Sequence, residues 1–406
     1  MMAGNDATQR KACARPAVVA VGYNRPEALL RLLESLRAGA YPPGVPLVIS
    51  LDWSGDAAPA AVAEAFEWPH GPKRVIRHPQ QLGLREHILA CGDLTQEFGG
   101  IILFEDDIVA APHHYAYVQA AFDFYGDEPA IGGVALYSYR LNEFNNLDFE
   151  ALDDGSDVYF LQVAASWGQA WTASQWSAFR AWYGRHSGDP IRVEDRLPRQ
   201  LEAWRANSWK RFYIKYLTAT GRTFVFPRPS LSTNMAIAGT NTKRLVSIYQ
   251  SPLDLLPRRW RFRSLANSLA QYDVFYEPLP STLRALQPRL ADADFDVDLF
   301  GTKPRQALSR PDLLSSRPTG AARQGFGLLT GAPPAASIAQ AQPGDFFSLA
   351  RRDTFGAMTR RRLYTLARAS QVGSAFNKVM FQTLKPLQTE LLIRKARARD
   401  KALASG

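Results

Sequence analysis

Short apolar runs alternate with helix-spaced apolar positions along the first third of the chain. Runs rich in β-branched residues are typical of strands buried on both faces, and apolar residues three or four apart are typical of helices packed on a sheet. We expect strands at 17–21, 47–51, 74–76, 100–104 and 131–137, and helices at 58–66, 84–98, 115–125 and from Pro26 onward. This alternation predicts an α/β fold with a mostly parallel sheet flanked by helices.

Three acidic residues, Glu105, Asp106 and Asp107, directly follow the apolar run 100–104. Open α/β sheets bind their ligands at the carboxyl ends of the strands. Adjacent carboxylates offer the hard oxygen ligands that suit Mg²⁺ or Mn²⁺, with waters and ligand phosphates completing the octahedron. The alternative is an acidic loop whose carboxylates cap the next helix.

Two more polar segments follow predicted strands in the same way. They are Tyr23-Asn24-Arg25 and Asp52-Trp53-Ser54. Three polar loops at one edge of a parallel sheet favour a nucleotide site.

Composition is that of a globular protein, with 46% apolar and 21% charged residues in 406. Two cysteines, Cys13 and Cys91, indicate neither a disulfide framework nor a zinc pattern, so a reducing compartment is expected. Residues 1–14 lack an apolar signal core, and no run approaches the roughly 20 apolar residues of a membrane span. These features predict a cytoplasmic protein.

The net charge of +10 comes from the C-terminal tail, because residues 351–401 hold 13 Lys and Arg but only three acids. Apolar residues interleave with these basic ones at helical spacing, which predicts amphipathic helices that lie on an anionic membrane surface. An arm packed on the body or on another subunit is an equal alternative. Nucleic acid binding is not expected, since no recognisable module accompanies the charge.

Tryptophan is concentrated in residues 140–240, at positions 167, 171, 176, 182, 204 and 209. Such rings can form a sugar-stacking platform, but they more often belong to the core and to interfaces.

Several segments together resemble a known family. Residues 18–34, 48–52, 82–89 and 101–108 look like the nucleotide-sugar half of a GT-A-fold glycosyltransferase. The acidic triplet is similar to the Glu-Asp-Asp form of the DxD motif in N-acetylglucosaminyltransferase I-like enzymes. Residues 165–176 and 207–239 resemble the acceptor half of bacterial relatives that build surface polysaccharides.

The resemblance implies a Rossmann-like GT-A domain with a helical basic C-terminal extension. The expected organisation is a disordered N-terminus (1–15), the GT-A domain (16–240, with nucleotide-sugar and acceptor halves at about 16–138 and 139–240), a packed extension (241–314), a Ser/Pro/Gly/Ala-rich linker (315–344) and the basic tail (345–406).

The resemblance also implies roles for single residues. Asp107 matches the acid that binds the metal, while Glu105 and Asp106 match those that face the ribose and the metal's waters. Asp52 matches an acid that reads the uracil edge, and the remaining matched positions, near the base or the diphosphate, are Asn24, Arg25, Arg85 and His87.

Three of these residues have plain structural alternatives. Asp52 could be a turn former at the end of a strand, since Ser54-Gly55 follow it. His87 could be packed on a helix face, and Arg25 could be a solvated residue in a first helical turn.

The chain departs from the family at the expected catalytic base. The family has Asp directly before Trp in the acceptor half, where this chain reads Asn207-Ser208-Trp209. Asp189, Glu194 and Asp195 are the nearest upstream carboxylates that could take the acceptor's proton. Glu194 and Asp195 lie between arginines, so plain ion pairing is the alternative.

We therefore expect a metal-dependent, inverting glycosyltransferase of the hexosyl or N-acetylhexosaminyl type that uses Mn²⁺ or Mg²⁺. Its expected partners are a nucleotide-sugar donor, with UDP favoured, and a glycan or lipid-linked acceptor in bacterial surface polysaccharide synthesis, at the inner membrane face. A non-catalytic, nucleotide-sugar-binding scaffold subunit is the alternative. A nucleotidyltransferase is less favoured, because residues 22–26 do not resemble its Gly-rich basic loop.

Overall fold

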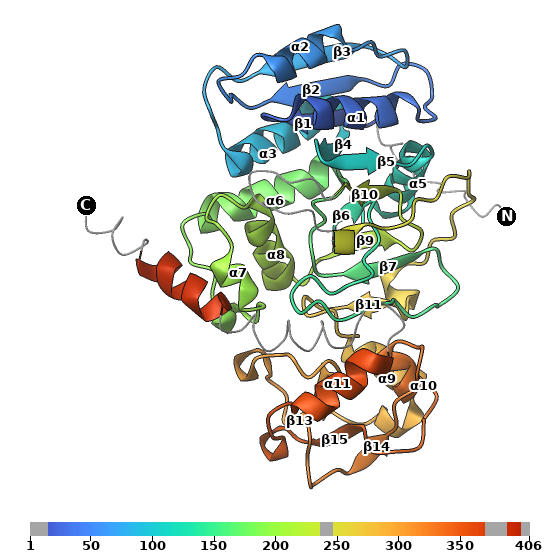
Figure 1. Ribbon diagram of the computed structural model, residues 1–406. Helices are drawn as coiled ribbons and strands as arrows, with labels where there is room; N and C mark the ends of the chain where they lie inside the picture. The colour runs from blue at the N-terminus through green and yellow to red at the C-terminus, as the bar shows by residue number, and fades with distance from the viewer. Residues whose placement is uncertain (1–14, 236–246, 370–387, 399–406) are drawn as a thin grey trace, which may run out of the picture.

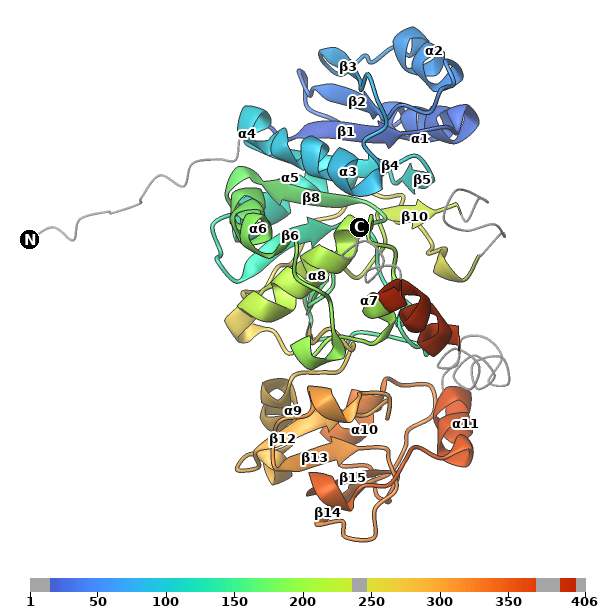
Figure 2. The ribbon, with the colours of Figure 1, turned by 90° about the vertical axis from the view of Figure 1, so that its left-hand side faces the viewer.

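The computed structural model describes residues 15–235, 247–369 and 388–398. A large α/β unit built on a nine-stranded sheet lies above a smaller α/β unit in Figure 1. The smaller unit carries its own four-stranded sheet, and both views show the two units stacked end to end (Figure 2).

One half of the large sheet is parallel, in the order β3-β2-β1-β4. Its strands are β1 (Ala17–Gly22), β2 (Leu47–Leu51), β3 (Lys73–Arg77) and β4 (Gly100–Glu105). The helices that follow them are α1 (Pro26–Arg37), α2 (Ala58–Ala65), α3 (Leu84–Asp93), α4 (Thr95–Phe98) and α5 (His114–Tyr125). The register places Val21 beside Glu105 and Gly22 beside Leu51, so β1, β2 and β4 end at the same edge.

The other half of the sheet continues as β8-β6-β9-β7-β11. Its strands are β6 (Ile131–Ala135), β7 (Val158–Leu161), β8 (Gln169–Thr172), β9 (Thr223–Pro227) and β11 (Gln271–Tyr272), and its helices are α6 (Ala173–His186), α7 (Gln200–Ala203) and α8 (Trp209–Thr220). β8 runs antiparallel to both β4 and β6, whereas β6 and β9 are parallel. The predicted fold class, a mostly parallel sheet flanked by helices, is confirmed.

The core explains most of the aromatic residues. Trp171, Trp176, Trp182 and Trp209 are buried, and Trp171 and Trp176 pack against each other and against Tyr213 of α8. Of the six tryptophans in residues 140–240, Trp167 and Trp204 are half-buried. The core interpretation therefore holds for four of the six tryptophans.

A short antiparallel ribbon lies next to the acidic triplet. It pairs β5 (Ile108–Ala110) with β10 (Ser232–Asn234). Met235 after β10 also donates its N–H to the carbonyl of Asp107, with 2.8 Å between N and O. The segment that follows β9 is thereby joined to the acidic loop.

The smaller unit differs from the linker and tail expected at 315–344 and 345–406. Its sheet has the order β12-β13-β15-β14, and the unit also holds α9, α10 and α11. The bounds are α9 (Pro280–Leu286), β12 (Phe295–Asp298), β13 (Asp312–Ser315), β14 (Gln324–Phe326), α10 (Pro334–Ala339), β15 (Phe347–Arg351) and α11 (Arg360–Ala369). The supposed linker supplies β14 and α10, because Phe326 and Ile338 are buried in the core of this unit.

A helix at 388–398 packs on the large unit beside α7. Arg397 pairs with Glu202 at 2.9 Å, and Glu390 pairs with Arg199 at 2.7 Å. This part of the tail follows the packed-arm alternative. Residues 1–14, with Cys13, lie outside the described residues, and Cys91 is a buried free thiol.

Candidate functional site

The acidic triplet forms the turn between β4 and β5, and its three residues differ in burial. Glu105 is the last residue of β4, and Asp106 and Asp107 make the turn. Asp106 is buried, whereas the Asp107 side chain remains 24% exposed. Because Trp209 binds the half-buried Glu105 and Arg25 binds Asp106, Asp107 is the member of the triplet best placed to meet a ligand.

Arg25, the residue directly before α1, holds Asp106 through two nitrogens of its guanidinium group. Its Nε donates to Oδ2 at 3.2 Å, and its Nη2 contacts Oδ1. The same Nη2 lies 3.7 Å from Oδ2 of Asp107. Burial alone would lower the pKa of Arg25, but the charge of Asp106 raises it, so the guanidinium stays charged. The solvated alternative for Arg25 is therefore wrong.

Glu105 is half-buried at the end of β4, and its partial burial together with the charges of Asp107 and Asp106 raises its pKa to about 8. The carboxyl is therefore harder to ionise than a solvated glutamate. A side-chain hydrogen bond joins it to Trp209, the first residue of α8. The amino end of α8 thus reaches the acidic triplet.

Asp52, at the end of β2, fixes the turn that precedes α3. It accepts hydrogen bonds from the N–H groups of Leu82 at 2.7 Å and Gly83 at 2.9 Å. Gly83 has φ +79°, a left-handed conformation that favours glycine. Asp52 also lines a cavity of about 270 Å³ together with Tyr23, Trp53 and His78. Asp52 therefore acts as a turn-forming residue, as the structural alternative predicted, and it does so at the wall of a cavity.

His87 is buried, and its ring packs against that of His78, which lines this cavity. Its Nε2 is 2.8 Å from Oγ of Ser50, and it is absent from the residues that line the cavity. Burial lowers its pKa to about 4, despite the nearby charge of Asp52. His87 is therefore a neutral packing residue.

Arg85 is a half-buried residue of α3. Its Nη1 donates to the carbonyl of Ala206 at 3.2 Å, and its guanidinium lies 5.5 Å from the ring centre of Phe212. It therefore connects α3 to the loop before α8. Asn24 is exposed beside Arg25 at the end of β1.

The three predicted bases lie on the flank of α8. Asp195 pairs with Lys215 at 3.1 Å, Asp189 pairs with His186 at 2.7 Å, and Glu194 is exposed. Lys215 is six residues beyond Trp209, which is about 9 Å along a helix. Asp195 thus lies well along α8 from the end that meets Glu105, and its pair with Lys215 fits the ion-pair alternative, although the partner is not one of the flanking arginines.

Sequence reasoning missed a carboxylate that is closer to the amino end of α8. Glu143, between β6 and β7, pairs with Lys210 at 2.8 Å, and Lys210 directly follows Trp209. The hydroxyl of Tyr139 donates to the other oxygen of Glu143 at 3.3 Å. Both charged side chains are less than 10% exposed. No local sequence motif predicts this ion pair, because its members are 67 positions apart in the chain.

Aromatic rings surround this ion pair. The Lys210 ammonium lies 5.3 Å from the ring of Trp167, 5.7 Å from that of Trp204 and 5.8 Å from that of Tyr139. Trp167 and Trp204 are the two tryptophans of residues 140–240 that stay half-buried. A carboxylate beside partly exposed rings is a suitable setting for a sugar.

Tyr139 also borders a polar cleft of about 740 Å³ between the two units. The cleft is lined from the β6–β7 connection, the segments after β9, and residues 331–334 of the smaller unit. Arg228 in its wall donates to the carbonyl of Ser156 at 2.8 Å and to that of Ala151 at 3.0 Å. Arg228 therefore fixes the β6–β7 connection, which forms this wall of the cleft.

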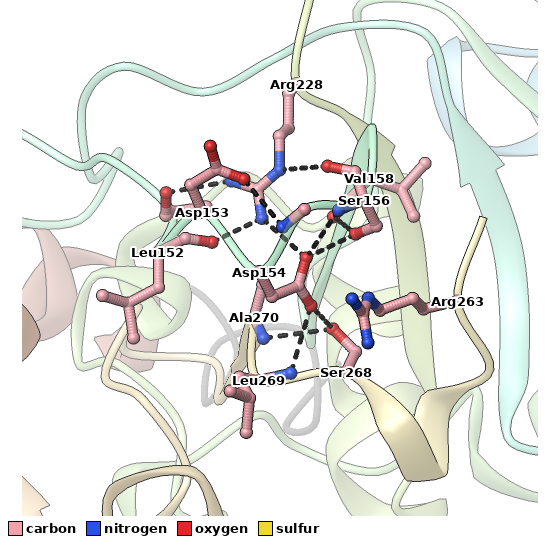
Figure 3. Close-up of polar contacts among 12 residues, drawn as sticks. Leu152, Asp153, Asp154, Ser156, Val158, Arg228, Arg263, Ser268, Leu269 and Ala270 are labelled. Atoms are coloured by element: carbon pink, nitrogen blue, oxygen red, sulfur yellow. Dashed lines mark hydrogen bonds and ion pairs between the residues drawn. The ribbon is translucent and has the colours of Figure 1, made fainter. Parts of the chain in front are cut away.

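Asp154 is the centre of the same network (Figure 3). It accepts from the hydroxyls of Ser156 and Ser268, both at 2.6 Å, and pairs with Arg228. Burial acts to raise its pKa, but these hydrogen bonds and the charge of Arg228 outweigh burial and lower the pKa to about 2. The network joins the β6–β7 connection to the segment before β11.

Within the described ranges, no group of three or more Asp, Glu, His or Cys side chains is arranged to hold a metal ion. A magnesium-like ion bound with a diphosphate needs only one or two protein carboxylates, because phosphate oxygens and waters supply the rest. The partly exposed carboxylate of Asp107 could serve as such a single protein ligand.

No protein-family model matches the chain, and a search of curated proteins found no match. Solved GT-A-type glycosyltransferases resemble part of it. A mannosyltransferase from Pyrobaculum calidifontis in complex with GDP-Man and Mn²⁺ has 13% identity and a TM-score of 0.33, over 52% of this chain and 55% of that chain. S. aureus TarS 1-349 in complex with UDP has 11% identity and a TM-score of 0.33, over 53% and 59%.

GalNAc-T7 with UDP, GalNAc and Mn²⁺ has 15% identity and a TM-score of 0.35, over 53% of this chain and 43% of that chain. The chain thus spans about half the length of these structures.

Proposed function

We propose that the chain is a metal-dependent glycosyltransferase that transfers a sugar from a nucleotide-sugar to a glycan or lipid-linked acceptor. The observation that carries the proposal is the meeting of three segments at the acidic loop. Arg25 from the end of β1 holds Asp106, Trp209 from α8 holds Glu105, and Asp107 stays accessible. This is the carboxyl edge of a parallel sheet, where such folds bind nucleotides.

The proposed donor site lies between this loop and the cavity beside Asp52. Trp53 is 49% exposed and lines that cavity with Tyr23, so their rings offer faces on which a nucleobase could stack. The sequence resemblance favours UDP over other nucleotides. Asn24 and Arg85 are proposed contacts of the nucleotide, whereas His87 is buried against Ser50 and outside the cavity lining.

Asp107 is the proposed protein ligand of a divalent cation, Mn²⁺ or Mg²⁺. Such an ion would neutralise the charge that builds on the departing nucleoside diphosphate. Arg25 stays charged beside Asp107 and adds positive potential at the same place.

Glu143 is the proposed catalytic base in place of the family's missing Asp. An inverting reaction needs a carboxylate that takes the proton of the attacking hydroxyl. Glu143 is held through Lys210 next to Trp209, and half-buried Trp167 and Trp204 supply faces for the acceptor sugar. The polar cleft beyond Tyr139 is the proposed path of the acceptor chain.

The biological setting is proposed from the sequence resemblance. It is bacterial surface polysaccharide synthesis, of lipopolysaccharide, capsule or exopolysaccharide, with inversion at the transferred sugar. The transferred group is a hexosyl or N-acetylhexosaminyl unit.

Calorimetric titration of UDP, GDP and CMP with and without Mn²⁺, followed by donor hydrolysis assays, tests the proposal. Metal-dependent binding of one nucleotide with slow hydrolysis of its sugar conjugate is expected. No binding of any nucleotide would overturn it.

A nucleotide-sugar-binding scaffold subunit is the second candidate. It is favoured by one observation, the Asn207-Ser208 pair where the family has its base. Nucleotide binding without turnover on any acceptor would support this alternative.

A further inference from the structure

Residues 254–263 form a loop that begins with two exposed leucines and continues with an arginine-rich segment. Leu255 and Leu256 are 60% and 73% exposed, the highest values for large hydrophobic side chains among the described residues. The sequence Arg258-Arg259-Trp260-Arg261-Phe262-Arg263 follows them. The loop belongs to the yellow coil at the right of Figure 1.

The basic part of the loop alternates between inward rings and outward charges, as an extended chain does. Trp260 packs on Tyr117 of α5 with 4.5 Å between ring centres, and Phe262 packs on Phe124 at 5.5 Å. The four arginines between and beside these rings are all exposed. The rings therefore attach the loop, and the arginines face solvent.

Hydrogen bonds hold the loop in place. Asp157 accepts from the N–H of Arg261 at 2.8 Å, and the N–H of Asp157 donates to the carbonyl of Arg261, also at 2.8 Å. The hydroxyl of Tyr125 donates to the carbonyl of Arg263 at 2.5 Å. The arginine-rich segment that follows Leu255 and Leu256 is thus fixed to the body of the protein.

The loop keeps a positive excess. Asp254 pairs with Arg258 at 3.0 Å, and Asp157 pairs with Arg261 at 3.3 Å. Arg259 and Arg263 form no ion pair with any described residue, and no dashed line leaves the Arg263 guanidinium in Figure 3. Two exposed leucines above uncompensated arginines match a surface that is apolar inside and anionic at its headgroups.

We propose that residues 254–263 dock the protein on an anionic phospholipid bilayer. Leu255 and Leu256 enter the acyl boundary, and the arginines lie against the lipid phosphates. Residues 251–254, which lead into the loop, line the polar cleft between the two units. Docking therefore brings the mouth of that cleft to the membrane surface. The inference does not depend on transferase activity.

The helix at 388–398 provides a matched comparison. Its Leu391 and Leu392 are 59% and 52% exposed, and it also carries basic residues. However, Arg397 and Arg394 pair with Glu202 and Glu390, and the helix lies on the opposite side of the molecule in Figure 1. One flat membrane cannot contact both surfaces equally, so variants at the two leucine pairs distinguish them.

The test is co-sedimentation of the full chain with phosphatidylcholine vesicles that contain or lack phosphatidylglycerol. We expect binding only with phosphatidylglycerol, weakened by salt because screening shortens the reach of the charges. Leu255→Ser with Leu256→Ser should lower the partition coefficient about tenfold or more, as should Arg259→Gln with Arg263→Gln. Leu391→Ser with Leu392→Ser should have little effect.

Three results would overturn the proposal. The first is unchanged sedimentation of the Leu255→Ser, Leu256→Ser variant. The second is loss of binding only in the Leu391→Ser, Leu392→Ser variant, which would assign the membrane contact to the tail. The third is vesicle-independent self-association that the Leu255→Ser, Leu256→Ser variant abolishes, which would make the loop an interface between copies. Unchanged melting temperatures control for folding, since all four leucines are exposed.

Discussion

At the scale of single residues, Glu105, Asp106 and Asp107 are adjacent in the chain yet have three different environments. Glu105 is half-buried against Trp209 and has a raised pKa, Asp106 is buried and paired with Arg25, and Asp107 keeps an accessible carboxylate. Placing three charged carboxylates side by side would be unfavourable in a buried turn. Because the three carboxylates have different partners, the negative charge of Asp107 is the one left to face a ligand.

Asp107→Asn should remove metal-dependent nucleotide binding, because an amide is a weaker ligand for a hard cation. We expect affinity in the presence of Mn²⁺ to fall by about 100-fold, or roughly 2.7 kcal/mol, and the melting temperature to change little. Calorimetric titration with Mn²⁺ measures the effect, and Asp123→Asn on the exposed side of α5 is the control. A large loss of thermal stability with metal binding intact would make Asp107 a structural residue.

Glu143→Gln should lower kcat by about 10²–10⁴ while the KM for the donor stays unchanged. The same change leaves Lys210 without its partner in a buried site, which costs stability. The double variant Glu143→Gln, Lys210→Met removes that unpaired charge and should regain stability but not activity.

Asp195→Asn serves as the matched control for this measurement, because Asp195 pairs with Lys215 on the flank of α8. Recovery of turnover in the double variant, or loss of turnover in Asp195→Asn, would contradict the role of Glu143.

At the scale of elements, single carboxylates fix the loops that surround the site. Asp52 accepts hydrogen bonds from the turn before α3. Asp154, in the β6–β7 connection, accepts hydrogen bonds from the segment before β11 and so joins the two. Each accepts several hydrogen bonds from another part of the chain, which orders a loop without needing a core of its own. The edges of the cavity and of the cleft are therefore preformed.

Asp154 makes the cleft wall sensitive to acid. Its pKa is lowered from an ordinary 3.8 to about 2, so its stabilising contribution is fully present above about pH 4 and disappears as pH falls through about 2. Asp154→Asn should cost roughly 1–3 kcal/mol near neutral pH, and the difference from the natural chain should shrink over that acid range. Urea unfolding of both proteins across the range measures this, and a constant difference would contradict it.

At the scale of the whole molecule, the C-terminal part is a second folded unit and not a linker with a tail. β15 lies between β13 and β14, so a segment after residue 344 completes a sheet that began before residue 300. Leu366 of α11 packs into the same core. The unit also lines the cleft through residues 331–334.

Truncation after Gly344 should unfold the smaller unit, because it removes β15 from the middle of the sheet. Truncation after Ala369 keeps all four strands and α11 and should keep a cooperative unfolding transition. Calorimetry and limited proteolysis compare the two proteins. Equal stability of both truncations would contradict the observed sheet order.

Local pattern predicted the elements of the first half because each strand and helix there buries a face along its own length. Leu29, Leu32, Leu33 and Leu36 are fully buried at helical spacing, as the α1 pattern requires. The end of β4 was likewise readable, since the acids follow the strand directly. β14 and α10 were hidden, because they are short and their composition is that of a linker.

The sequence by itself determined the alternation of strands and helices, the position of the acidic triplet at a strand end, and the location of the basic charge. Only the tertiary structure decided which carboxylate stays accessible, that His87 is enclosed, and that Glu143 meets Lys210 beside Trp209. The physical reason is range. Periodicity and strand ends are properties of neighbouring residues, whereas burial, ion pairing and pKa depend on partners that folding brings from far along the chain.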